Sequence, residues 1–397
     1  MTAKERVRIA LDGGKPDRVP FLLECDYDYM AIAAGREPWQ YEFGDEAERA
    51  AIHEDLYRRH PTDLWKCWGG RSRRLAGQRQ VVMRGGEPWL QVLTTGREYR
   101  IDGLGNLSDG QGRPVALDRE GKEVSQRSAA VWVASDGYPR SVESEADIEE
   151  LLGPVPPAPF WIEDGFLATL ERLLPKYGQS HFLMFPLNTI FADALDLFGG
   201  FQAGLEATYS KRALFHRALE VIVEWKKSRL RAGASLGAPG AWMIEYCAGA
   251  DTISPAMYRE FVFPYEQEVA REARRLGLRT YMWYLGHVMP LVPDLARLEV
   301  DALFPEQGRK GYEVDIVEMR RLVGERMCLI GFNDEQALIR GDQQGLVSEM
   351  RRQIEGAGRD GAFIMGTTII TGDTPVEHVD FYVQALAELG DYRRLGA

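Results

Sequence analysis

The stretch RTYMWYLG (residues 279–286) is a run of aromatic and aliphatic residues that ends in a glycine. A short run of this kind, closed by a glycine, indicates a buried β-strand. The preceding stretch SPAMYREFVFPYEQEVAREARRLG (254–277) is long enough for a helix, and its Ser-Pro start matches an N-cap followed by proline at the first helical position. Before that helix lies another apolar run, AWMIEYC (241–247). Strand, helix and strand in this order predict a βα repeat with parallel strands.

The same pattern recurs along the chain, where short apolar runs are each followed by a polar or glycine break and then by a helical pattern. The runs are RVPFLLEC (18–25), DLWKCW (63–68), HFLMFP (181–186), AWMIEYC (241–247), RTYMWYLG (279–286), DALFP (301–305), MCLIGF (327–332) and AFIMG (362–366). Eight βα units close a barrel. The sequence therefore predicts an α/β protein, a (β/α)8 TIM barrel, with residues 1–397 forming one domain.

Residues 69–142 interrupt the repeat after the second predicted strand. This segment holds turn-rich pieces such as RGGEPW, DGLGN and DGQGRP between runs of alternating polarity. Period-two patterns bounded by Asp-Gly and Gly-Gly turns are typical of β-hairpins. We expect a β-rich insertion within the barrel domain, and its role stays open between covering a pocket and docking a partner.

Composition excludes several classes of function. The chain of 397 residues has a formal net charge of −12, which disfavours nucleic acid or an anionic membrane surface as a partner. The start MTAKERVRIALDGG has no apolar core of a signal peptide, and no run of about 18 apolar residues occurs. We therefore expect a soluble, cytoplasmic protein whose four cysteines stay reduced.

The active site of such a barrel lies at the carboxyl ends of its strands, so the residues where each apolar run ends are the candidates. Nitrogen, sulfur and oxygen donors of the kind that bind a catalytic zinc stand at three consecutive strand ends: Glu245, Cys247, His287 and Glu306. Because side chains alternate along a strand, Glu245 and Cys247 share one side, and we expect both to face the barrel mouth. The structural alternative is a buried Cys247, a loop histidine at 287, and acids that pair with arginines.

Other strand-end residues suit an organic substrate. Aromatic side chains that can stack on a flat ring are Tyr27, Trp68 and Tyr284, and side chains that can make polar contacts are Asp26, Asn188, Asn333 and Asp334. We expect an acidic and aromatic mouth, which suits a neutral aromatic substrate better than a polyanion. The alternative is that the aromatic residues only fill the top of the barrel.

Five segments carry a resemblance to a known family. They are ERVRIALDGGKPDRVP (5–20), TISPAMYREFVFPYEQEV (252–269), LGHVMPLVPDLARLEVDALFPEQ (285–307), GERMCLIGFND (324–334) and DGAFIMGTTIITGDTPVEHVDFYVQALAELG (360–390). Together they resemble the uroporphyrinogen decarboxylase superfamily, in particular its corrinoid-linked methyltransferases. The resemblance spans nearly the whole chain outside the insertion. It implies a (β/α)8 barrel that acts on a small molecule or on a methyl group carried by a separate corrinoid protein, and it leaves a homodimer open.

The chain departs from the site patterns of that superfamily. Its zinc-dependent methyltransferases typically carry His-x-Cys at the end of the fifth strand, where this chain has Trp283 and Leu285, and a later cysteine where it has Thr368. Glu306 alone stands where an acidic ligand is expected, so zinc would need the rearranged set with Glu245, Cys247 and His287. The RQAGRY segment of the decarboxylases is replaced by ECDYDYMAIAAGRE (24–37).

The leading hypothesis is a methyltransferase that acts as the O-demethylase component of a corrinoid-dependent system, with a methoxylated aromatic as methyl donor. The leaving oxygen then needs a Lewis acid, here zinc held with Glu245, or a proton donor, here His287 or Tyr284, while Asp26 and Asn333 orient the ring. A cofactor-free decarboxylase of a small aromatic acid is the alternative. It would need a cationic anchor such as Arg71, Arg73 or Arg309. A barrel that only binds a ligand is the third reading.

Overall fold

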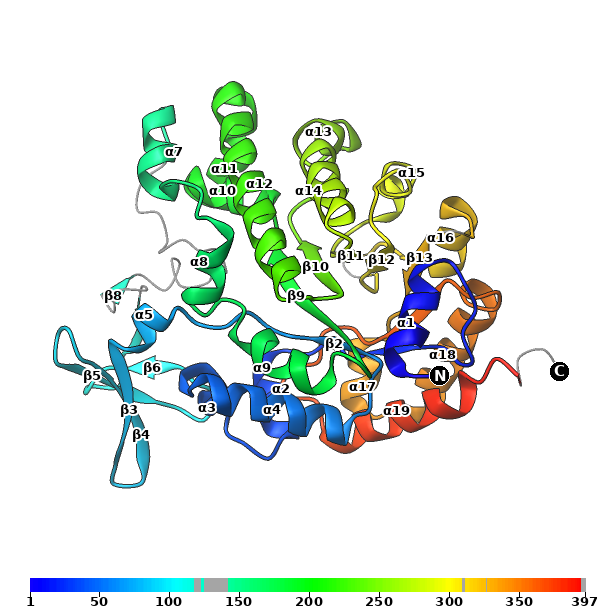
Figure 1. The fold of residues 1–397 in the computed structure, drawn as a ribbon, viewed down its shortest axis with the longest axis horizontal. Coiled ribbons are helices and arrows are strands. Elements are labelled where there is room, and N and C mark those ends of the chain that lie inside the picture. Colours follow the sequence, from blue (N-terminus) through cyan, green and yellow to red (C-terminus); the bar gives the residue numbers. More distant parts are fainter. Residues whose placement is uncertain (118–122, 125–141, 309–310, 326, 394–397) are drawn as a thin grey trace.

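The computed structural model describes residues 1–117, 123–124, 142–308, 311–325 and 327–393 (Figure 1). Eight parallel strands close a barrel in the order β1-β14-β13-β12-β11-β10-β9-β2. Each strand lies within a predicted apolar run or extends at most two residues beyond it, so the predicted (β/α)8 barrel is confirmed. The strands are β1 (Phe21–Leu22), β2 (Leu64–Lys66), β9 (Phe182–Asn188), β10 (Gly240–Glu245), β11 (Arg279–Tyr284), β12 (Ala302–Pro305), β13 (Cys328–Ile330) and β14 (Phe363–Gly366).

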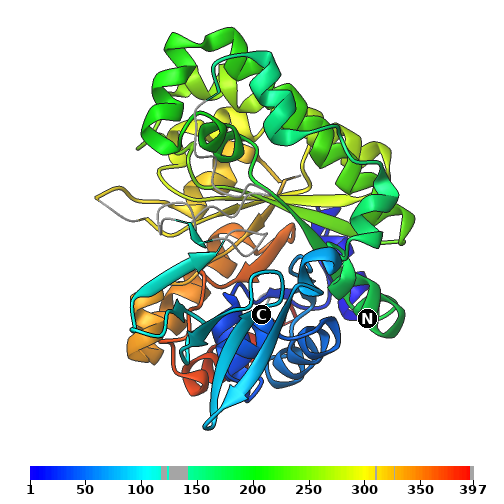
Figure 2. The same cartoon turned by 90° about the vertical axis from the view of Figure 1, so that its left-hand side faces the viewer.

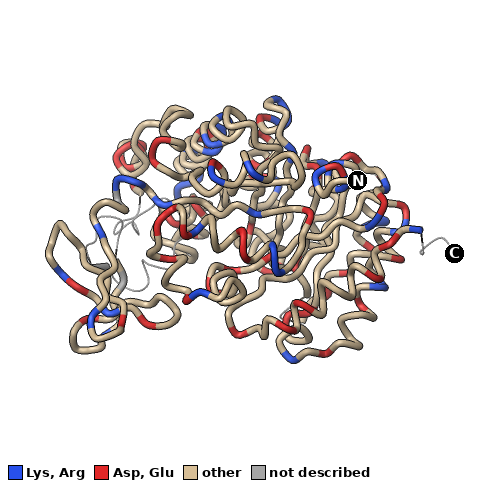
Figure 3. Tube along the Cα trace, turned by 60° about the horizontal axis from the view of Figure 1, so that its bottom comes forward, with Lys and Arg blue, Asp and Glu red and all other residues tan. Residues whose placement is uncertain are grey.

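Helices surround the barrel and follow each strand (Figure 1). Before β9 they are α1 (Ala3–Leu11), α2 (Tyr27–Ala33), α3 (Pro38–Phe43), α4 (Glu46–Arg59), α5 (Arg73–Ala76), α7 (Glu145–Leu152), α8 (Ala158–Glu163) and α9 (Ala168–Tyr177). After β9 they are α10 (Phe191–Leu197), α11 (Phe201–Ser210), α12 (Arg212–Ser235), α13 (Pro255–Phe261), α14 (Phe263–Arg275), the 3-10 turn η1 (Met289–Leu291), α15 (Val292–Leu295), α16 (Ile316–Val323), α17 (Glu335–Arg340), α18 (Gln343–Ala357) and α19 (Val376–Leu389). None of the helices in the described ranges has the length and apolar character needed to span a membrane. Basic and acidic residues are interspersed along these helices (Figure 3).

The helix predicted over residues 254–277 is divided into α13 and α14. Its start is confirmed, because the Ser254 side chain accepts a hydrogen bond from the backbone N–H of Met257. The break falls at Val262, whose φ of −120° and ψ of −62° lie outside the helical range. Pro264 has no backbone N–H to donate to the carbonyl four residues earlier, and this is the physical reason for the break.

The predicted β-rich insertion contains a six-stranded antiparallel sheet that lies to one side of the barrel in Figure 1 and faces the viewer in Figure 2. Its Gly85-Gly86 turn has φ angles of 59° and 89°, as a two-residue hairpin between β3 and β4 requires. Residues 118–122 and 125–141 of the predicted insertion lie outside the described residues. The strands are β3 (Arg79–Arg84), β4 (Glu87–Val92), β5 (Arg97–Ile101), β6 (Leu107–Ser108), β7 (Pro114–Leu117) and β8 (Glu123–Val124).

Side chains of β10 and β11 alternate between the barrel interior and the helix layer. The ring of Trp283 lies 5.0 Å from the Lys66 ammonium of β2, which is three strands away in the barrel order, so Trp283 points inward. The next residue, Tyr284, points outward and donates a hydrogen bond of 3.0 Å to Glu266 of α14. Glu245 pairs in register with Tyr284 and therefore also points outward.

Candidate active site

A lysine and a glutamate form an ion pair inside the barrel. The Lys66 ammonium, from β2, donates a hydrogen bond to Oε1 of Glu24, just beyond β1. Both residues are buried, with 1% and 0% of their surface exposed. Because charged groups are rarely fully buried unless they are paired, the interior has a polar centre that a plain hydrophobic core would lack.

Three tryptophans surround the Lys66 ammonium. The distances from its nitrogen to the ring centroids are 3.9 Å for Trp242, 4.6 Å for Trp68 and 5.0 Å for Trp283. Each lies within the range of a cation–π interaction, which strengthens when the cation is removed from water. The Trp68 and Trp242 rings also meet edge to face at 5.4 Å. We call Lys66, Glu24 and these three residues the tryptophan cage.

Several polar atoms near this cage lack a partner within the described residues. Glu24 Oε2, Trp242 Nε1 and the Tyr281 hydroxyl are buried and make no hydrogen bond there. Such atoms cost free energy unless water or a ligand satisfies them. They are one acceptor, one donor and one group that can do both. The interior therefore offers unused hydrogen-bonding positions to a small molecule.

Proton transfer is the chemistry that this centre can perform. Burial raises the pKa of Glu24 to about 7, and the nearby Lys66 charge partly opposes that rise. Burial and the Asp28 charge raise the pKa of Asp26 to about 6, while Lys66 again acts in the opposite direction. A carboxyl group that titrates near neutral pH, bonded to an ammonium, can pass a proton to or from a bound molecule.

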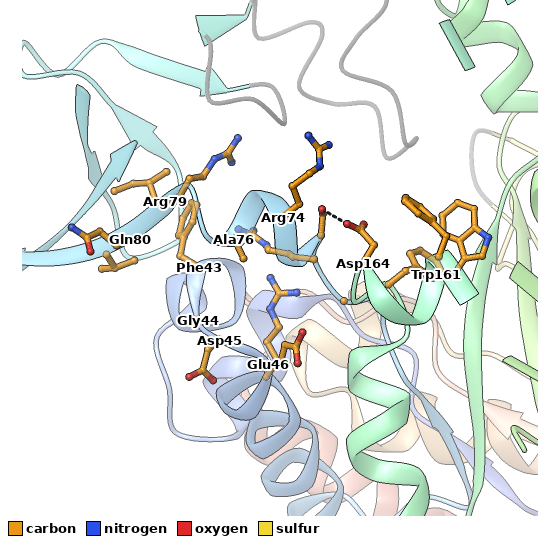
Figure 4. A pocket seen from close by; sticks show the side chains of 18 of the residues that line it. Phe43, Gly44, Asp45, Glu46, Arg74, Ala76, Arg79, Gln80, Trp161 and Asp164 are labelled. Atoms are coloured by element: carbon orange, nitrogen blue, oxygen red, sulfur yellow. Dashed lines mark hydrogen bonds between the residues drawn. The ribbon is translucent and has the colours of Figure 1, made fainter. Parts of the chain in front are cut away.

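A cavity of about 610 Å³ lies near the carboxyl ends of β2 and β9 (Figure 4). Gly70 and Arg71, which line it, follow Trp68 closely in the chain, and Asn188 is the last residue of β9. Its charged lining residues are Arg49, Arg71, Arg74, Arg79, Arg229, Asp45, Glu46 and Asp164, and its large aromatic ones are Phe43, Phe160, Trp161, Phe166 and Trp225. The prediction of an acidic mouth is wrong for this cavity, because the arginines outnumber the acids. The counts of charges along the chain did not reveal which of them converge.

Three of the residues predicted to bind substrate lie at these two places. Trp68 belongs to the tryptophan cage, the charge of Lys66 acts on Asp26, and Asn188 lines the cavity. Asn188 also has a φ of 60°, in the left-handed region that asparagine tolerates better than most side chains. Tyr27 instead stacks on Tyr41 at 6.1 Å.

Two other residues predicted to bind substrate hold the backbone at strand ends. Asn333 donates to the carbonyl of Asp334 at 2.9 Å and accepts from the backbone N–H of Thr368 at 2.9 Å. Asp334 is the N-cap of α17 and accepts from the N–H of Ala337 at 2.6 Å. These bonds join the loops after β13 and β14.

Glu245 and Tyr284, predicted as catalytic, do not face the barrel interior. Both point into the helix layer, where Glu245 accepts from the Thr189 hydroxyl at 2.7 Å and from the backbone N–H of Cys247 at 2.9 Å. The expectation that Glu245 faces the mouth is wrong, because strand alternation places Trp283 inward and places Tyr284, the register partner of Glu245, outward.

The four predicted zinc ligands do not form a metal site. Within the described ranges, no three His, Cys, Asp or Glu side chains gather as a metal ion requires. The His287 ring stacks on Tyr312 at 4.9 Å, and burial raises the pKa of the Cys247 thiol, which disfavours the thiolate that binds zinc. Glu306 is buried at the end of β12. The donor set Glu245, Cys247, His287 and Glu306 therefore does not fit a zinc ion in this arrangement.

Sequence reasoning missed Lys66 and did not select Glu24 from the strand-end residues. The available signal was a lysine in the middle of the apolar run DLWKCW (63–68). The register of a barrel strand decides whether a lysine at a central position points into the barrel or toward the helices. A lysine that points into the barrel is buried and needs an oppositely charged partner.

The buried carboxyl group of Glu266 predicts an unusual dependence of stability on pH. It accepts hydrogen bonds from Tyr258 at 2.9 Å and Tyr284 at 3.0 Å, and burial together with the nearby Glu245 charge raises its pKa to about 8. The folded protein keeps a proton that the unfolded chain releases above its ordinary pKa of 4.5, so raising the pH from about 5 to 8 lowers the free energy of unfolding. We expect a loss of about 3–4 kcal/mol from this group over that pH range.

Chemical denaturation at pH 5.5, 7.0 and 8.5 measures this effect. The Glu266→Gln variant should show a shallower loss of stability with rising pH than the unaltered protein, because glutamine does not titrate. An equal slope in both proteins would contradict the assignment.

Comparisons with known proteins identify the family. The sequence model described as "Uroporphyrinogen decarboxylase (URO-D)" matches residues 189–389, which is half of the chain. The chain belongs to the uroporphyrinogen decarboxylase family. The URO-D match begins directly after β9, so Glu24, Lys66 and Trp68 lie outside it, whereas Trp242 and Trp283 lie within it.

Curated URO-D relatives are similar over the same half of the chain. Uroporphyrinogen decarboxylase of Trichodesmium erythraeum is 25% identical over 185 residues, covering 46% of this chain and 50% of that protein. The enzyme of Thermus thermophilus is 27% identical over 183 residues, with 46% and 50% covered. The chain thus spans about half the length of the curated relatives that it matches.

A solved structure is similar over nearly all of the chain. A methyltransferase from Methanosarcina mazei superposes with a TM-score of 0.69 and covers 98% of this chain and 99% of its own. The two sequences are 17% identical, so this likeness shows the fold.

Proposed function

We propose that this URO-D family member is a methyltransferase that moves a methyl group from a small methoxylated aromatic to the cobalt of a corrinoid on a separate protein. The observation that carries the proposal is the Lys66 ammonium, held by Glu24 inside a cage of three tryptophans. The fold shared with a Methanosarcina methyltransferase supports the same class of reaction.

The reaction requires a proton at the leaving oxygen. The bond between the methyl carbon and the ether oxygen breaks, the reduced cobalt of the partner supplies the electron pair of the new bond to carbon, and the oxygen keeps the old pair. A phenolate leaves more easily if a proton reaches it in the transition state. Lys66 can supply that proton while Glu24 holds its ammonium in place, and Glu24 can take part in returning the proton afterwards.

The tryptophan rings give the donor a surface to stack on. Aromatic rings prefer offset or edge-to-face contacts with one another, and such contacts add to the burial of apolar area. Trp68 is partly exposed and precedes the cavity-lining residues Gly70 and Arg71 closely in the chain. A methoxyarene at this position would bring its oxygen toward Lys66. The four predicted zinc ligands have no part in this proposal.

Incubation with methoxyarenes and reduced cobalamin, which replaces the partner's corrinoid, tests the proposal. We expect enzyme-dependent release of the phenol, matched by the absorbance change that accompanies methylation of the cobalt. If no phenol is released from any compound of a broad panel of mono- and dimethoxyarenes, the proposal is wrong. Omission of cobalamin is the control and should stop phenol release.

A cofactor-free decarboxylase of a small aromatic acid is the second candidate. The arginines of the cavity favour it, because a carboxylate needs a cationic anchor, and Arg71, named from the sequence for that role, lines the cavity. It predicts release of carbon dioxide without any corrinoid, whereas the methyltransferase predicts none. Measuring both products in one reaction separates the two candidates.

A further inference from the structure

The cavity near the carboxyl ends of β2 and β9 carries an excess of positive charge. Five arginines and three acids line it, in a chain whose formal net charge is −12. A concave site lined by one sign of charge concentrates ligands of the opposite sign. The cavity also lies within the size range of small-molecule sites, which is about 300–1,000 Å³.

The three acids of the cavity are already engaged by groups outside or at its edge. Glu46 pairs with Arg73 at 2.6 Å and with Arg172 at 3.5 Å, and neither arginine lines the cavity. Asp45 is the N-cap of α4 and accepts from the backbone N–H of Glu48 at 2.8 Å. Asp164 accepts from the Ser72 hydroxyl at 2.6 Å. Neutral donors leave the charges of Asp45 and Asp164 in place, and the charge of Glu46 also acts on Arg49, so the excess of positive charge is that of five arginines over three acids.

Two of the arginines have no carboxylate partner among the described residues. Arg49 is buried, and its hydrogen bonds go to the backbone carbonyls of Tyr41 at 2.8 Å and Glu42 at 3.1 Å. Arg74 is exposed and extends from α5 on the same side of the cavity as Arg79 (Figure 4). Arg71, by contrast, pairs with Glu42. A buried cation bonded only to carbonyl groups is stabilised when an anion approaches it.

The walls of the cavity suit a flat apolar ring. The Arg229 guanidinium lies 4.3 Å from the ring centroid of Trp161 and 4.5 Å from that of Phe166, so these groups are already stacked. Trp225 also lines the cavity, and its Nε1 is a buried donor for which the described residues supply no acceptor. An aromatic ring that carries an acidic group matches both the walls and the charge.

We propose that this cavity binds an aromatic carboxylate. Its acidic group is bound by Arg49 and Arg74, and its ring contacts the aromatic wall. The further statement that this acid is the methyl donor, with its methoxy group directed to Lys66, rests on the proposed function. The binding of the acid in the cavity does not depend on it. The lining residues other than Trp225 and Arg229 lie before residue 189, so the cavity is built mainly outside the part of the chain matched by the URO-D model.

Calorimetric titration of the enzyme alone with 3-methoxybenzoate and with 3-methoxybenzamide tests the proposal. The two probes have nearly the same shape and differ in charge. We expect the carboxylate to bind about tenfold more tightly than the amide, which corresponds to one charge-assisted interaction of about 1.4 kcal/mol. Equal affinity for the two probes would overturn the proposal.

Substitutions locate the binding. Arg49→Gln and Arg74→Gln should each remove most of the preference for the carboxylate, whereas Arg84→Gln, an exposed arginine of β3 that does not line the cavity, should leave it intact. Arg74 is on the surface, so we expect Arg74→Gln to fold. This variant therefore tests the binding site even if Arg49→Gln does not fold. An unchanged preference in Arg74→Gln counts against the site. If 3-methoxybenzoate binds but neither it nor any other methoxyarene of the panel is demethylated, the methyl-transfer proposal fails and the cavity assignment stands.

Discussion

Replacement of Lys66 by methionine is expected to lower the rate of methyl transfer by about 10²–10⁴-fold, the usual contribution of a positioned proton donor. Methionine is unbranched and flexible, so it can fill the space between the three tryptophan rings without a proton to donate. The Michaelis constant for an aromatic acid should change much less, because the arginines that we propose to bind its carboxylate remain. The loss therefore falls on turnover and not on affinity.

Steady-state kinetics with reduced cobalamin measure this change. The matched control is Lys226→Met, which removes another buried lysine, one that pairs with Asp193 in the helix layer. It should retain turnover if it folds, and circular dichroism of both variants checks folding. Turnover of Lys66→Met equal to that of the unaltered enzyme would exclude Lys66 as the proton donor.

Replacement of Glu24 by leucine is expected to destabilise the protein by about 3–5 kcal/mol, since it leaves the Lys66 ammonium buried without its counter-ion. The tryptophan rings offset part of that cost, but a cation–π contact does not replace a carboxylate. The converse loss is smaller: without Lys66, the pKa of Glu24 rises further because the charge that lowers it is gone, and the group becomes a neutral acid.

A double substitution distinguishes loss of the pair from general damage. Glu24→Leu combined with Lys66→Met removes both charges and should recover most of the stability lost in Glu24→Leu, because an apolar pair can replace a buried ion pair at little cost. Thermal unfolding of the two single variants and the double variant gives the coupling between them. If the double variant is as unstable as Glu24→Leu, the unpaired charge of Lys66 is not the cause of the lost stability.

The barrel could be predicted because its signals are local. Each apolar run of about five to eight residues that ends in a glycine or polar break is sufficient evidence for one buried strand, and eight such runs leave few other architectures. The hairpins of the insertion were equally readable from turns such as Gly85-Gly86. The break between α13 and α14 was missed, although Pro264 marks it.

The direction of a side chain was the part that sequence reasoning could not supply. Glu245 and Tyr284 stand at strand ends, as expected, but a shift of one residue decides whether such a side chain faces the barrel or the helices. The same uncertainty concealed Lys66, since a lysine at 66 that pointed outward would be an ordinary surface residue. Trp68 joins the cage because it shares the orientation of Lys66, two residues before it, and its contact with a substrate stays a prediction.

The sequence by itself determined the eight strands, their order along the chain and the place of the insertion, because hydrophobic periodicity and turn residues act over a few neighbours. Only the tertiary structure decided that Lys66 meets Glu24, that tryptophans from β10, β11 and the end of β2 enclose it, and that arginines from α4, α5, β3 and α12 share one cavity. These contacts join residues far apart in the chain. They depend on the closure and register of the barrel, which no single stretch of sequence encodes.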